Sequence, residues 1–276
     1  MINIDIEDFK DIKYEKEENG ICTITMNRPE RRNALSALSF LELQAALDHM
    51  EQDDEVKVAI MTGNQEGRAF TSGAYLNPKV MSEMTPETKK MLDPTDKSQR
   101  NMALKIFDFP KPIVAAVNGL AIGGGITMLL IGADLIYISE NAYLGFYFVN
   151  NAFMSEFAST FLLPLYLGFQ RAKEIIYYGG KIEAQKAFEL GLVNKVLPLN
   201  ELVPYAREQA LKLITPKAPG LSIRLMRKAV HDIFKDQIYK ILDIENEGYK
   251  TLLSSPNFRI AMSARQKKIE PAFKGS

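Results

Sequence analysis

The sequence predicts an α/β fold in which strands and helices alternate, followed by a region of helices alone. Apolar strand-like runs at 56–61, 112–117 and 135–138 are separated by segments long enough to hold helices. The runs are nearly continuous in apolar residues, as is typical of strands buried on both faces. Beyond about residue 200 no strand pattern appears. Amphipathic helical patterns follow at 201–215, 219–236 and 238–253.

The first elements have clear start and stop signals. Asn19-Gly20 is a strong hairpin turn, which joins a strand at 12–17 to a strand at 21–26. A loop at 27–33 follows, and Ser36 is a plausible N-cap for a helix that runs to about Met50. That helix carries a broad apolar face, which indicates packing against the sheet.

The later segments suggest two regions. Residues 77–101 are polar and contain three prolines, so we expect a mobile excursion near the surface. Residues 171–191 have a helical pattern that turns at Gly191. We therefore divide the chain into a core domain at 1–200, which would hold the site, and a helical region at 201–276.

Composition excludes several function classes. Lys plus Arg and Asp plus Glu both total 34 in 276 residues, so net charge favours no nucleic-acid or membrane partner. A single cysteine, Cys22, excludes an intramolecular disulfide and fits a reducing compartment. The N-terminus lacks a signal-peptide pattern, and the longest apolar stretch, 119–133, is too short to span a bilayer. We therefore expect a cytoplasmic protein.

Three adjacent glycines, Gly123 to Gly125, stand at the head of an apolar helical run. They do not fit a phosphate loop or a dinucleotide-binding fingerprint, because no Gly-Lys-Ser/Thr follows and Met128 occupies the last glycine position. No nucleophile elbow is present, and the two histidines have no metal-ligand spacing. The sequence thus predicts neither a metal nor a separate cofactor.

Glycines at a helix start can permit close packing or present a bare N–H to an anionic atom. A second glycine-bearing loop, AFTSGAYL at 69–76, follows an earlier strand. Two such loops could direct two N–H groups at one oxygen, which is the layout of an oxyanion hole.

At this point the sequence resembles the enoyl-CoA hydratase/isomerase (crotonase) superfamily over nearly its whole length. The matching motifs, in order, are NRPERRNALS at 27–36, AFTSGAYL at 69–76, KPIVAAVNGLAIGGG at 111–125, DLIYISENAYLG at 134–145 and AFELGLVNKVLP at 187–198. The resemblance implies repeated ββα units (the ClpP/crotonase fold) with a C-terminal helical part, and a homotrimer or dimer of trimers. It implies an acyl-CoA or acyl-carrier thioester as substrate, with coenzyme A as part of that substrate.

The resemblance also assigns site residues. Ser72 and Gly124 would donate the two N–H groups that stabilise a thioester enolate. Substrate contacts would come from three segments: the arginine-bearing loop at 27–36, the glycine-bearing loop at 69–76 and the turn after Gly145. The residues, in that order, are Arg31, Arg32, Ala34 and Leu35, then Ala69, Phe70, Ala74 and Tyr75, and then Phe148.

The sequence departs from the family's hydratases at both catalytic glutamates. Thr127 and Phe148 occupy the expected positions. Glu156 remains, and it matches the single catalytic glutamate of the Δ3,Δ2-enoyl-CoA isomerases. Apolar neighbours would raise the pKa of Glu156 toward a useful range. Alternatively, Glu156 is a helix-start residue capped by Ser155, and Glu83 and Glu87 are rival bases.

The prediction is therefore an enzyme of fatty-acid metabolism that moves a double bond in an enoyl-CoA, an isomerase rather than a lyase of the hydratase type. Two alternatives stay open. One is other acyl-thioester chemistry on the same scaffold, such as hydration, dehydration, decarboxylation or hydrolysis. The other is a non-catalytic acyl-CoA or acyl-carrier binding protein.

Overall fold

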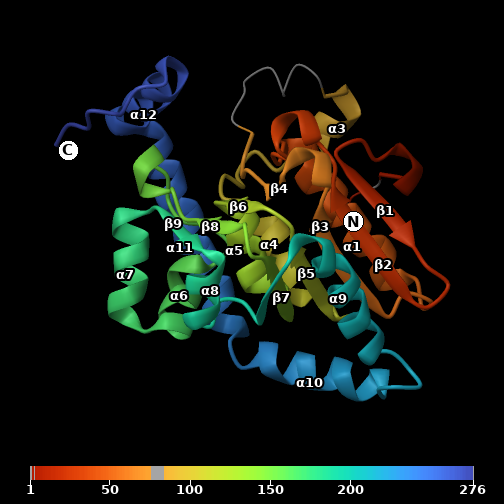
Figure 1. The fold of residues 1–276 in the computed structure, drawn as a ribbon. Coiled ribbons are helices and arrows are strands. Elements are labelled where there is room, and N and C mark those ends of the chain that lie inside the picture. The colour runs from red at the N-terminus through yellow and green to blue at the C-terminus, as the bar shows by residue number, and fades with distance from the viewer. Residues whose placement is uncertain (1, 3, 76–83, 276) are drawn as a thin grey trace.

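The computed structural model describes residues 2, 4–75 and 84–275 (Figure 1). Of the segment predicted as a mobile excursion, 77–83 lies outside the described residues, and so does the rival base Glu83. The remainder contains the short helix α3 (Pro86–Lys90) and the first residues of α4 (Arg100–Asp108).

Two sheets form the frame. The larger has the strand order β1-β2-β3-β5-β7-β10, with β1 antiparallel to β2 and the other pairs parallel. Its strands are β1 (Ile12–Lys16), β2 (Ile21–Met26), β3 (Val58–Gly63), β5 (Ile113–Val117), β7 (Leu135–Ser139) and β10 (Lys195–Leu197). The smaller sheet holds β4 (Ala69–Thr71), β6 (Leu120–Ile122), β8 (Tyr143–Gly145) and β9 (Lys181–Glu183), in that order.

Long and short strands alternate along the chain. The pairs β3/β4, β5/β6 and β7/β8 each send a long strand into the larger sheet and the next, short strand into the smaller one, and a helix follows. This is the repeated ββα arrangement, so the predicted fold class is confirmed. The three-residue strands were not predicted, because they are too short to show an alternating pattern.

Helices cover both faces of the larger sheet. On one face, α1 (Ala37–Gln52), α4 and α5 (Gly124–Gly132) share a buried apolar cluster with the strands. Ser36 caps α1 as predicted, accepting from the N–H groups of Leu38 and Ser39. On the other face α9 (Leu199–Lys212) buries Leu202, Ala206 and Ala210, so the core extends beyond the predicted boundary at residue 200.

Six further helices lie in the described part of the chain. They are α6 (Ser159–Leu167), α7 (Phe169–Tyr178), α8 (Ala184–Glu189), α10 (Gly220–Asp232), α11 (Lys235–Ser254) and α12 (Pro256–Lys267). The helix predicted at 171–191 is broken at Gly179-Gly180, which both have positive φ, and a strand separates its two halves. Figure 1 shows α11 leading from α10 back toward the smaller sheet and on to α12.

Four 3₁₀ turns complete the described elements: η1 (Ile6–Asp8), η2 (Pro29–Arg31), η3 (Gln65–Gly67) and η4 (Val149–Asn151). In the described part of the chain, no helix combines the length and the apolar character needed to cross a bilayer.

A buried arginine fastens α10 to the core. Arg227 is 8% exposed, and its guanidinium pairs with Asp134 at 3.0 Å. It also donates to the carbonyl oxygens of Phe109 and of Gly132. Asp134 in turn accepts from the Ile113 N–H, which joins α10 to the start of β5.

We expect Arg227→Ala to lower the free energy of unfolding by about 2–4 kcal/mol, because it removes the pair with Asp134 and leaves two buried carbonyls without their donor. The surface pair Lys228–Asp232 on the same helix offers a control, since Lys228→Ala should cost under about 1 kcal/mol. Urea unfolding of both variants measures the difference. Equal losses would contradict the fastening role of Arg227.

Candidate active site

A cavity of about 270 Å³ lies where the short strands end. It brings together segments far apart in sequence: the loops after β4 and β6, the turn after β8, the loop before α6, and the helices α11 and α12. Its lining residues are Ser72, Gly73, Ala74, Ile122, Gly123, Gly124, Tyr147, Phe148, Asn151, Phe153, Glu156, Tyr249 and Arg265. Among these described residues, Glu156 is the one acid.

The glycine triplet forms the start of α5 at this cavity. Gly123 has φ 55° and donates its N–H to the Gly145 carbonyl at 2.8 Å. Gly124 is the first residue of the helix, and its N–H has no acceptor within the described part of the chain. A Cβ at Gly124 would lie 2.7 Å from Glu156 Oε1. Bare backbone at Gly124 is thus required for the Glu156 carboxylate to lie against the start of α5.

The second predicted donor is wrong in its position. The Ser72 N–H donates to the Arg32 carbonyl at 3.0 Å, and the Gly73 N–H donates to Thr71 Oγ1 at 3.1 Å. The Ala74 N–H, by contrast, has no acceptor among the described residues, and Ala74 lines the cavity. On the two glycine-bearing loops, the N–H groups of Ala74 and Gly124 are therefore free to face the cavity.

A bridge between two loops explains which N–H stays free. Leu35 donates its N–H to Gly73 and accepts from Tyr75, so both of its bonds flank Ala74. In such a parallel bridge the intervening residue directs its own N–H away from the partner. Sequence matching placed the donor two residues too early, because only the hydrogen bonds distinguish these adjacent peptides.

Glu156 is buried at 5% exposure, in a loop before α6. The expectation of a helix-start residue is wrong, because α6 begins at Ser159, and the predicted cap Ser155 instead contacts Ser159 Oγ at 2.6 Å. No described residue donates a hydrogen bond to the Glu156 carboxylate. Burial, and then the charges of Glu245 and Asp96, raise the pKa of Glu156 to about 8.

The two positions of the missing hydratase glutamates lie close by but hold no acid. Thr127 is fully buried, and its hydroxyl donates back to the Gly123 carbonyl at 3.2 Å. Phe148 presents its ring to the cavity. The rival Glu87 lies exposed on α3 and is not part of the cavity lining.

The predicted substrate loops divide into two groups. Arg31 and Arg32 are exposed beside Ser72, and neither forms an ion pair with a described acid. The ring of Tyr75 lies under Arg28 and Arg31, 4.7 and 5.6 Å from their guanidinium carbons. Ala34 and Leu35 are buried behind that loop.

Ala69 and Phe70 depart from the prediction. Both are fully buried in β4, and neither lines the cavity, so they support the loop from the core. The family motif contains them because it spans the strand as well as the turn.

Three contributors on α11 and α12 were not predicted as site residues. Tyr249 and Arg265 line the cavity, and the Tyr249 ring stacks on Phe153 with centroids 5.3 Å apart. Glu245 is fully buried one helical turn before Tyr249. These residues follow Glu156 by 89, 93 and 109 positions in sequence, for Glu245, Tyr249 and Arg265.

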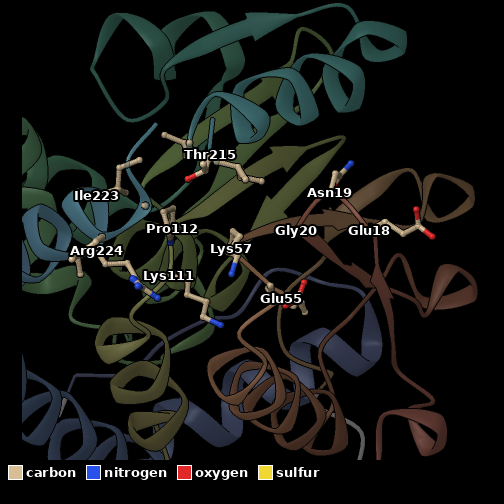
Figure 2. Close-up of a pocket in the computed structure, with 15 residues that line it drawn as sticks. Glu18, Asn19, Gly20, Glu55, Lys57, Lys111, Pro112, Thr215, Ile223 and Arg224 are labelled. Carbon is tan, nitrogen blue, oxygen red and sulfur yellow. The ribbon is translucent and has the colours of Figure 1, made fainter. Parts of the chain in front are cut away.

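A second cavity, of about 390 Å³, lies near the segments that enter β2, β3 and β5. Figure 2 shows Lys57, Lys111 and Arg224 around it. The Lys111 ammonium already donates to the carbonyls of Met50 and Asp53, and the Lys57 ammonium donates to that of Asp54. Since backbone carbonyls hold two of its three cations, the Glu156 cavity is the better candidate for chemistry.

Comparison with known proteins agrees with this geometry. The family model for enoyl-CoA hydratase/isomerase matches residues 16–276. The chain is 28% identical to a 1,2-epoxyphenylacetyl-CoA isomerase of Escherichia coli, over 94% of this chain and 96% of that protein. It is 32% identical to a short-chain-enoyl-CoA hydratase of Clostridium acetobutylicum, over 92% of this chain and 95% of that one.

A solved structure shares the fold. The crystal structure of an enoyl-CoA hydratase/isomerase from Pseudoalteromonas atlantica superposes with a TM-score of 0.83 at 28% identity. The match covers 96% of this chain and all of that one. The motifs, the repeated ββα frame and the family match agree, and the chain belongs to the enoyl-CoA hydratase/isomerase family.

Proposed function

We propose that the protein is an enoyl-CoA isomerase that moves a double bond from Δ3 to Δ2, with Glu156 as the group that transfers the proton. The observation that carries this proposal is the position of Glu156. It is the one acid among the described residues that line the cavity, no described donor satisfies it, and it lies directly over Gly124.

The chemistry needs one base and one oxyanion site. The Glu156 carboxylate removes a proton from C2 of a 3-enoyl thioester, and the electron pair passes into the thioester carbonyl to give a dienolate. The N–H groups of Ala74 and Gly124 would stabilise the oxygen of that dienolate, because they are free to donate. Glu156, now a carboxylic acid, returns the proton to C4, which leaves the conjugated 2-enoyl thioester and restores the carboxylate.

Hydration is the less favoured reaction at this site. Adding water across a double bond by the family's usual route takes two glutamates, and Thr127 and Phe148 stand in their places. The rings of Phe148 and Phe153 give the cavity an apolar wall, which disfavours a bound water beside the substrate. The named isomerase among the relatives, which acts on a different acyl group, is consistent with isomerisation on this scaffold.

Arg31 and Arg32 are the proposed contacts for the phosphates of coenzyme A. Both guanidinium groups are exposed near the cavity and free of described acids. Arginine suits phosphate because its fork of donors matches two oxygens at once. An acyl-carrier thioester would place a phosphopantetheine phosphate in the same region.

Glu156→Gln should lower kcat/KM for a 3-enoyl-CoA by about 10²- to 10⁴-fold, because the amide cannot accept the C2 proton. The assay follows formation of the conjugated 2-enoyl thioester. Glu87→Gln tests the rival base and should leave the rate within about twofold, since Glu87 is exposed on α3. Full activity of the Glu156→Gln enzyme would disprove the assignment.

The pH dependence follows from the raised pKa of Glu156. The base must be ionised, so kcat/KM should rise with pH and level off above about 8.

The stability of the fold has the opposite dependence on pH. A raised pKa in the folded state favours the neutral acid, so this contribution to stability is full below pH 4.5 and is lost as pH rises through about 8. Glu156→Gln should therefore unfold at a higher temperature than the wild type at pH 9 and at a similar temperature at pH 4.5. A constant difference across this range would refute the raised pKa.

We also infer that the chain forms a homotrimer or a dimer of trimers. The solvent-facing half of α10 and the residue after it expose five large apolar side chains, each 59–70% exposed: Leu221, Leu225, Met226, Val230 and Ile233. An apolar stripe of this kind on a helix is favourable only when another surface covers it. Further copies of the chain are the partner that the family resemblance supports.

Light scattering should give a particle about three or six times the 31.1 kDa mass of one chain. Leu225→Arg should shift the population toward smaller species, because it places a charge in the apolar stripe. Lys212→Ala, at an exposed position on α9, is the control and should leave the mass unchanged. A monomeric wild type at micromolar concentration would contradict the inference.

A further inference from the structure

The loop that carries Glu156 is fixed from behind by α11. Glu245, on this helix, has no exposed surface. Its Oε2 accepts from the Ala158 N–H at 2.7 Å, and its Oε1 accepts from the Thr160 N–H at 3.0 Å and from Thr160 Oγ1 at 2.6 Å. One carboxylate thus receives three hydrogen bonds from the segment that directly follows Glu156.

These bonds hold a turn that the backbone would not adopt by itself. Phe157 and Ala158 have φ of 58° and 56°, in the left-handed region that non-glycine residues seldom occupy. Two successive residues of this kind persist only when their surroundings determine them. The turn reverses the chain between Glu156 and α6, and so it sets the direction of the Glu156 side chain.

We propose that Glu245 is a positioning residue for the reaction: it holds the 157–160 turn and places a second buried negative charge behind Glu156. This rests on the proposed role of Glu156 as the proton-transfer group. The helix α11 would then belong to the catalytic apparatus, although the sequence assigns it to a separate helical region.

Among the described residues, the charges of Glu245 and Asp96 raise the pKa of Glu156, after burial. Asp96 faces it from the loop before α4, but the N–H groups of Arg100 and Asn101 already satisfy that carboxylate. Tyr249 of α11 and Arg265 of α12 line the same cavity. Glu245 is the larger of the two charge contributions to the raised pKa of Glu156.

Both carboxylates have raised pKa values. Burial raises the pKa of Glu245 to about 7, while its three hydrogen bonds oppose that rise. Glu156 has no such donors, and burial and then the charge of Glu245 raise its pKa to about 8. Glu156 returns to C4 the proton that it removes from C2, and a raised pKa makes its carboxylate a stronger base for the first step.

Glu245→Gln is the decisive variant, because glutamine keeps the size of the side chain and removes its charge. We expect kcat/KM at high pH to fall by about 10- to 100-fold. The amide of glutamine cannot accept all three hydrogen bonds, so the turn loosens and the Glu156 side chain moves away from its position. We also expect the midpoint of the pH profile to fall by about one unit, because Glu156 then ionises without a neighbouring charge. Glu247→Gln, on the same helix but exposed, should change neither.

A second variant covers the case in which Glu245→Gln does not fold. Thr160→Val removes the hydroxyl donor and leaves both backbone bonds in place. It makes the charged form of Glu245 less favourable, so the midpoint should move in the same direction by a smaller amount.

The outcomes separate this inference from the proposed function. If Glu156→Gln is inactive but Glu245→Gln and Thr160→Val keep the wild-type midpoint, the positioning role is overturned and the base assignment stands. If Glu156→Gln is fully active, the proposed function fails first. A lowered midpoint in both variants, with that of Glu247→Gln unchanged, supports the charge coupling.

Discussion

The site depends on one close approach, that of the Glu156 carboxylate to the backbone of Gly124. A side chain at Gly124 would meet Oε1 at 2.7 Å, so any other residue would displace the acid or the helix start. Gly125 is restricted in the same way, because a Cβ there would lie 2.2 Å from Thr71 Cγ2. The first glycine admits the carboxylate, and the second lets α5 pack against β4. The cavity exists because both contacts are made through bare backbone.

The repeated ββα frame explains why two free N–H groups meet at one place. The strands β4 and β6 are parallel neighbours, so the loops that follow them leave the smaller sheet at the same edge. One loop ends at Ala74 and the other starts α5 at Gly124. The antiparallel hairpin and the long helix α1 stabilise this frame from the N-terminal side, where the Glu42 carboxylate accepts three backbone N–H groups of residues 10–12. Geometry common to the repeats thus brings the loops with these two N–H groups to one edge of the smaller sheet.

Sequence reasoning predicted the frame well and the site in part. The long strands, the hairpin and the Ser36 cap follow from local patterns, and they are confirmed. The three-residue strands, the break at Gly179-Gly180 and the free N–H of Ala74 depend on contacts between segments that one sequence does not display. Glu156 could be found because a motif places it. Glu245 and Tyr249 could not, because an amphipathic helix does not indicate which of its buried residues meets a cavity.

A buried Glu245 beside Glu156 lowers the stability of the fold. This cost suggests that Glu245 is present for the reaction and not for folding. Two carboxylates in an apolar site destabilise the protein as each ionises, whereas a hydrophobic residue at position 245 would fill the same space without charge. Glu245 is instead satisfied by three donors from the one turn that orients Glu156. A base that must both take and return a proton works best when its pKa lies near the working pH. Burial alone would raise the pKa of Glu156. The proposed role of Glu245 adds a second effect, because this carboxylate also holds the turn that orients the Glu156 side chain. The three hydrogen bonds thus link the packing of α11 to the turn that follows Glu156.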